Sequence, residues 1–157
     1  MTPSSPEVLT RADRRRRAAR ALATALIVIV VGLELRFHGL GLPAFIVKYG
    51  GSVLWATMLY MLLVALLPRM PLWQIAGLAL GIAVIVEASR LIHTPWLDSF
   101  RLTLTGALLL GRIFSLWNIA AYVVGILIGV WIDRMAMRPA PAQANRRQAA
   151  ISTESSD

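Results

Sequence analysis

The sequence contains no cysteine and only two histidines, His38 and His93. Without cysteine, the chain cannot form a disulfide and offers no thiolate to a metal ion. Two isolated imidazoles are more typical of polar residues at a membrane interface than of metal ligands. We therefore expect no metal site and no cofactor.

Motifs that mark common enzyme classes are also missing. The chain has no GxSxG, no HExxH, no phosphate-binding P-loop and no internal repeat. Its glycines near residues 39–41 and 50–51 are interpreted as turn and packing glycines. No catalytic residue is assigned from the sequence.

Acidic residues are scarce, with 8 against 16 basic residues and a net charge of +8. The basic residues lie mainly at the ends of apolar runs, where membrane topology accounts for them better than nucleic-acid binding does. The run RADRRRR at residues 11–17 has no aromatic residues between its arginines. We interpret it as a cytoplasmic anchor that also attracts anionic lipid, and we expect no nucleic-acid partner.

Long hydrophobic runs are abundant. Hydrophobic residues make up 57% of the chain, and its mean hydropathy is +0.66. The runs do not alternate apolar and polar residues, as the strands of a membrane barrel would. The sequence therefore predicts an all-α, polytopic transmembrane helical bundle with four spans at about 18–35, 49–67, 72–92 and 118–132. Two glycine pairs, Gly77 with Gly81 and Gly125 with Gly129, have the spacing that permits close helix contact.

The segment between the third and fourth spans is harder to assign. Residues 102–110 are apolar but too few to cross a bilayer, and an extension to residue 117 places Arg112 at mid-membrane. We predict a short re-entrant or interfacial helix there.

Three regions are predicted from this pattern: a basic arm at residues 1–17, a transmembrane domain at 18–133 and a disordered tail at 134–157. With four spans, eleven basic residues lie on the side of the two termini and five on the other side. The positive-inside rule places both termini in the cytoplasm.

The topology gathers polar residues on the outer side. Glu87 lies in an apolar run about 22 Å from the cytoplasmic start of the third span, and Arg90 is one turn further out. The candidate binding cluster on this face contains Glu34, Arg36, Glu87, Arg90, Arg101, Arg112 and Asn118. One interpretation is purely structural, with Glu87 paired to Arg90 or Arg101 to fix the connector. The other is a cleft whose arginines bind an anionic group such as a lipid phosphate.

Two segments resemble a family of small bacterial membrane proteins, domain of unknown function 2809: KYGGSVLWATMLYMLL and WLDSFRLTLTGALLLGRIFSLWNIAAYVVGI. More distantly, they resemble the VanZ-like family, which is linked to low-level teicoplanin resistance. The residues that match are Glu87, Arg101, Gly106, Gly111, Phe114, Tyr122 and Gly125. Arg90 stands where the family has Gln, and Asn118 where it has Asp. The resemblance implies a multi-pass protein of the bacterial inner membrane with no known activity, and it favours Arg101 over Arg90 as the partner of Glu87.

Three functional hypotheses follow. The favoured one is a non-enzymatic membrane protein whose outer-face cluster binds an anionic envelope lipid or another membrane protein. The second is an enzyme acting on a lipid-linked substrate with Glu87 as base, and the third is a small transporter or a transporter subunit. The sequence does not indicate an oligomeric state.

Overall fold

The computed structural model describes residues 11–37, 41–92, 94–109 and 115–137. In these ranges the chain forms six helices: α1 (Arg11–Phe37), α2 (Ala44–Leu66), α3 (Leu72–Ser89), α4 (Pro95–Leu102), α5 (Leu104–Leu109) and α6 (Leu116–Met137). Four of them, α1, α2, α3 and α6, are long and apolar enough to cross a membrane. The predicted all-α bundle with four spans is confirmed.

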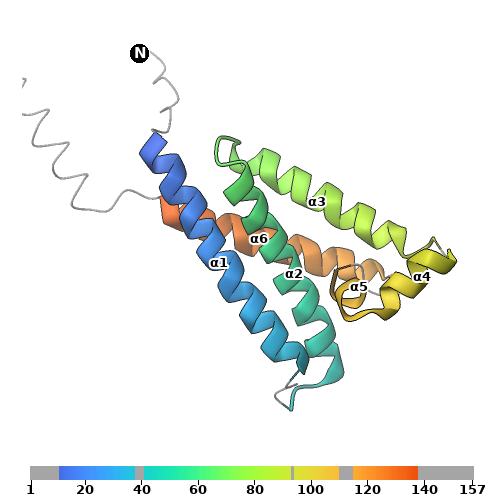
Figure 1. Cartoon of the computed structure of the whole chain (residues 1–157). Helices are drawn as coiled ribbons and strands as arrows, with labels where there is room; N and C mark the ends of the chain where they lie inside the picture. The colour runs from blue at the N-terminus through green and yellow to red at the C-terminus, as the bar shows by residue number, and fades with distance from the viewer. Residues whose placement is uncertain (1–10, 38–40, 93, 110–114, 138–157) are drawn as a thin grey trace, which may run out of the picture.

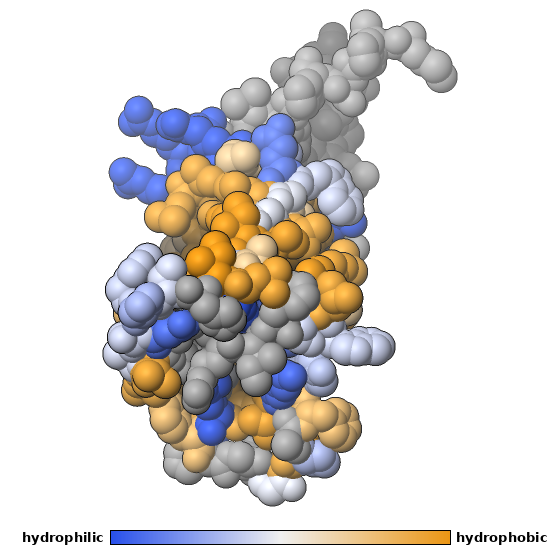
Figure 2. Space-filling view, turned by 90° about the vertical axis from the view of Figure 1, so that its right-hand side faces the viewer, coloured by the Kyte–Doolittle hydropathy of each residue, from blue (hydrophilic) through white to orange (hydrophobic). Residues whose placement is uncertain are grey.

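The bundle is built around α2. This helix packs extensively against α1 on one side and α6 on the other, while α3 packs mainly against α6 (Figure 1). The start of α1 and the end of α6 lie at the same end of the bundle, and α4 and α5 lie at the other end, beyond the end of α3 (Figure 1). Figure 2 shows a broad hydrophobic surface with hydrophilic residues above and below it, as expected for helices surrounded by lipid.

Glycine sets the distance between α2 and α6. A Cβ atom on Gly125 would collide with the carbonyl oxygen of Val53, and one on Gly129 would lie 2.7 Å from the ring of Tyr60. The predicted close contact at this glycine pair is confirmed. Gly77 and Gly81 make no such contact among the described residues, because both are exposed and no described atom lies within 4 Å of a Cβ built on either.

The buried faces of the helices follow a spacing of three and four residues, as expected for amphipathic packing. In α3 the buried residues are Ile75, Ala79, Ala83 and Glu87. In α1 they are Arg17, Ala21 and Ala25. The buried face of α6 begins with Asn118 and ends with Asp133. Each of these apolar faces therefore carries a polar residue at one or both of its ends.

The connector after α3 differs in detail from the prediction. The short helix predicted from residue 102 corresponds to α5, which begins at Leu104, and α4 before it was not predicted. Thr103, between the two helices, has an extended backbone. The Thr103 hydroxyl accepts a hydrogen bond from the backbone N–H of Gly106 at 3.1 Å, and thereby caps the start of α5. With eight and six residues, α4 and α5 are too short to span a bilayer.

The ends of the outer helices extend beyond the predicted spans. Helix α1 begins at Arg11, within the predicted basic arm, and α6 continues to Met137, past the predicted start of the tail. The remainder of the predicted tail lies outside the described residues.

Candidate functional site

The candidate site is centred on Glu87, whose side chain is completely buried at the end of the apolar face of α3. Its position follows from helix geometry, since it lies one turn beyond Ala83 on the face that packs against α6. A carboxylate buried in this way is stable only if nearby groups compensate its charge.

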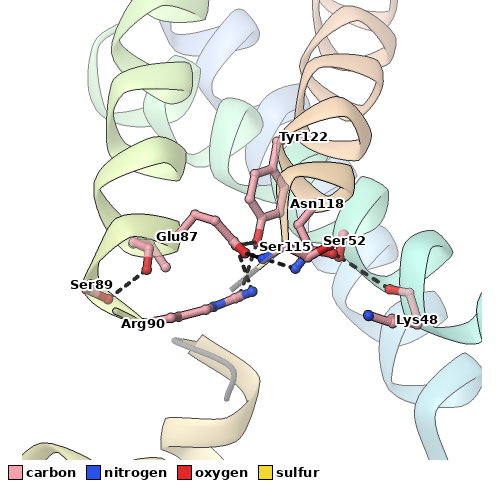
Figure 3. Close-up of polar contacts among 9 residues, drawn as sticks. Lys48, Ser52, Glu87, Ser89, Arg90, Ser115, Asn118 and Tyr122 are labelled. Atoms are coloured by element: carbon pink, nitrogen blue, oxygen red, sulfur yellow. Dashed lines mark hydrogen bonds and ion pairs between the residues drawn. The ribbon is translucent and has the colours of Figure 1, made fainter. Parts of the chain in front are cut away.

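Both carboxylate oxygens are compensated. Oε1 accepts hydrogen bonds from the backbone N–H of Ser115 at 2.7 Å and from the side-chain amide of Asn118 at 3.1 Å. Oε2 accepts one from the Tyr122 hydroxyl at 2.7 Å and lies 2.6 Å from a guanidinium nitrogen of Arg90. Figure 3 shows these groups converging on the carboxylate from α6 and from the end of α3.

We call Glu87, Arg90, Ser115, Asn118 and Tyr122 the Glu87 cluster. Its members also contact one another and α2. Arg90 donates a hydrogen bond to the Tyr122 hydroxyl at 3.1 Å, and Ser52 of α2 donates one to the Asn118 side-chain oxygen at 3.4 Å. The cluster therefore joins α2, α3 and α6 at one end of the bundle.

The predicted site residues are only partly brought together. Glu87, Arg90 and Asn118 are in direct contact. Arg36 and Glu34 lie exposed near the end of α1. The side chain of Arg101 and the whole of Arg112 lie outside the described part of the chain. The predicted Glu87–Arg101 pair therefore stays a prediction. The arginine observed to pair with Glu87 is Arg90.

A cavity of about 870 Å³ lies beside the Glu87 cluster, and we call it the Lys48 cavity. Its lining comes from α1, α2 and α6, together with Arg90. The apolar side chains include Val28, Ile29, Leu54 and Met58, whereas the polar ones are Arg36, Lys48, Ser52, Arg90, Asn118 and Tyr122. Three of these are cations, and the described lining residues include no acidic side chain.

The polar and apolar parts of the Lys48 cavity are separated along the helices. On α1 the lining runs from Val28 to Arg36, and on α2 it runs in the opposite direction from Val47 to Met58. The charged residues therefore lie at the end of the bundle that holds the Glu87 cluster, and the apolar residues extend toward the middle of the bundle.

A second polar group lies at the opposite end of the bundle and was not expected from the sequence. Arg17 forms a two-point ion pair with Asp133, with nitrogen–oxygen distances of 3.2 Å and 2.7 Å. It also donates hydrogen bonds to the carbonyls of Pro68 and Met70 at 3.0 Å and 3.1 Å, and Tyr60 donates one to Asp133 at 3.3 Å. We call Arg17, Tyr60 and Asp133 the Arg17 cluster.

Neither cluster has the composition of a metal site. Among the described residues, no three histidine, aspartate or glutamate side chains lie close enough together to hold a metal ion. Each buried carboxylate is instead matched by one arginine and one tyrosine hydroxyl.

Comparison with known proteins gives a family but no structural precedent. No solved structure matches the chain. The family model described as "Protein of unknown function (DUF2809)" matches residues 41–126, more than half of the chain. The match includes the whole Glu87 cluster and Lys48, whereas Arg17 and Asp133 lie outside it. The chain therefore belongs to the DUF2809 family.

Proposed function

We propose that this membrane protein binds an anionic, phosphate-bearing lipid in the Lys48 cavity, as a binding protein rather than as an enzyme. The observation that carries the proposal is the pairing, in one cavity, of an apolar wall with three cationic residues, Arg36, Lys48 and Arg90. An amphiphile with a negative head group has the complementary arrangement.

The charge available to a ligand comes mainly from Arg36 and Lys48. Arg90 already compensates Glu87, so its charge is partly neutralised within the cluster. Arg36 and Lys48 are exposed, and the Lys48 ammonium group lies 5.2 Å from the centre of the Tyr49 ring. Side chains of this kind commonly extend toward lipid head groups, and the cavity between them gives the lipid a defined position.

The enzyme hypothesis has less support. A general base needs a free lone pair directed at the proton that it removes. Both oxygens of Glu87 already have two partners each, and those partners are fixed by α6 and by Arg90. The arrangement is suited to holding the helices and the cationic wall in place.

Lipid binding can be tested by native mass spectrometry with phosphatidylglycerol and with phosphatidylcholine of the same acyl chains. We expect the intact protein to prefer phosphatidylglycerol. Lys48→Gln and Arg36→Gln should each weaken that binding about five-fold, because a basic residue near a lipid head group contributes about 1 kcal/mol. Arg69→Gln is the control, since Arg69 is an exposed arginine in the turn between α2 and α3, at the opposite end of the bundle, and does not line the cavity. Equal binding of the two lipids, or an equal loss in the control, would refute the proposal.

We also propose a multi-pass orientation in the bacterial inner membrane, with the start of α1 and the end of α6 in the cytoplasm. The support is the excess of basic residues on that side, including those at positions 11, 14, 15, 16, 17 and 20. Alkaline phosphatase, which is active only outside the cytoplasm, should be inactive when fused after Arg138 and active when fused after Leu42, between α1 and α2. The reverse pattern would overturn the orientation.

A further inference from the structure

We infer that one acyl chain of the bound lipid enters the Lys48 cavity, and that Gly32 and Gly51 provide the space for it. This inference rests on the proposed function and concerns the part of the ligand that the cationic residues do not contact. It begins from the depth of the cavity. Val47 and Met58, at its two ends on α2, are eleven residues apart, which corresponds to about 16 Å of helix.

This depth matches one leaflet of a bilayer. The hydrocarbon core is about 30 Å thick, so one leaflet contributes about half of it. The charged end of the cavity lies near the ends of the helices, where head groups are found, and the apolar end extends to Met58, midway along α2. An acyl chain whose head group contacts Arg36 and Lys48 would therefore extend along the apolar wall toward the bilayer centre.

The two glycines of the cavity differ from those that pack helices together. At Gly125 and Gly129 an added Cβ would collide with α2. At Gly32 the nearest atom to an added Cβ is Leu54 Cδ1, 4.0 Å away, and at Gly51 there is no atom within 4 Å. Both residues line the Lys48 cavity. Glycine at these positions is not required by contact between helices, and its effect is to keep the cavity wide.

The volume of the Lys48 cavity is sufficient for part of a lipid molecule. A cavity of about 870 Å³ falls within the range of about 300–1,000 Å³ that is usual for sites holding a small molecule. Larger side chains at residues 32 and 51 would occupy this space directly, while the cationic residues would remain in place.

The test is photo-crosslinking with a phosphatidylglycerol that carries a diazirine midway along one acyl chain, with mass-spectrometric mapping of the crosslinks. In the wild-type protein we expect crosslinks at lining residues such as Leu54 and Met58. Gly32→Leu and Gly51→Leu should each lower these crosslinks about ten-fold, because the larger side chain and the acyl chain would compete for the same space. Gly77→Leu is the matched control, since Gly77 is an exposed glycine of α3 outside the cavity.

Crosslinks at residues on the outer surface, such as Val30, report lipid that surrounds the protein, because Val30 is 59% exposed and does not line the cavity. They should persist in every variant, which also shows that each variant is folded and embedded. Crosslinks confined to such residues, or an equal loss in Gly77→Leu, would overturn the inference. Lining crosslinks that form equally with a phosphatidylcholine probe would instead refute the charge preference and leave the chain site intact.

Discussion

Replacement of Asp133 with Asn is expected to lower the free energy of unfolding by about 3–5 kcal/mol, because it leaves the guanidinium of Arg17 buried without its counter-ion. Both side chains are more than nine-tenths buried. Arg17 also contacts α6 and the turn between α2 and α3 at once, through Asp133 and the carbonyls of Pro68 and Met70. The loss should therefore affect three elements together.

The measurement is a double-mutant cycle in detergent, with Asp133→Asn, Arg17→Gln and the double variant compared by thermal unfolding. The double variant should be less destabilised than the sum of the single variants, because no unpaired charge is then buried. Arg16→Gln, an exposed neighbour on α1, should change stability by less than about 0.5 kcal/mol. Additive losses at Arg17 and Asp133 would show that the two side chains do not interact.

The four spans could be predicted from the sequence because each is a separate apolar run, and because the segment 68–71 places two prolines around an arginine. The need of Glu87 for polar partners could also be predicted from its apolar run. A carboxylate within an apolar run has to be compensated, whatever the fold. The composition of its compensating cluster depends on which helices are neighbours, and that information is not present in any one run.

Arg17 and Asp133 were missed because they lie where an apolar run meets a polar terminal segment. There, an arginine or aspartate is equally consistent with a solvated tail, and the two residues are 116 positions apart. A usable signal did exist in their spacing. Arg17 lies four residues before Ala21 and eight before Ala25, and Asp133 continues the buried positions of α6 past Gly129 and Val130.

The tyrosines carry a second signal. Tyr60 and Tyr122 each lie within an apolar run, and both are almost fully buried. A buried phenol normally finds a hydrogen-bond partner, so each tyrosine indicates a nearby acceptor. In this protein the acceptors are the two buried carboxylates, Asp133 and Glu87. The Lys48 cavity, by contrast, depends on how α1 and α2 separate, which no local pattern specifies.

Replacement of Glu87 with Gln is the second change for which we expect a large loss, about 3–5 kcal/mol of the free energy of unfolding. Gln has nearly the same shape, but it replaces one acceptor oxygen with an amide donor. Each Glu87 oxygen faces two donors. The new NH2 group would therefore face donors in either orientation of the amide, and it would have no acceptor there. The charge of Arg90 would also remain without its counter-ion.

The structural effect should reach the start of α6. Glu87 accepts the backbone N–H of Ser115, which precedes α6, and the side chain of Asn118 in its first turn. Hydrogen exchange should therefore increase in the first turn of α6 in Glu87→Gln, more than in the last turns of the same helix. Glu34→Gln is the matched control, because Glu34 is an exposed glutamate at the same end of the bundle.

A double-mutant cycle decides which arginine compensates Glu87. Arg90 lies 2.6 Å from the carboxylate, so Glu87→Gln combined with Arg90→Gln should cost less than the sum of the single changes. The same cycle with Arg101→Gln tests the pairing that the family resemblance favours. Coupling with Arg90 alone would establish the ion pair of the Glu87 cluster as described. Additive losses with Arg90 would mean that the ion pair does not stabilise the fold and that Glu87 is held by Ser115, Asn118 and Tyr122.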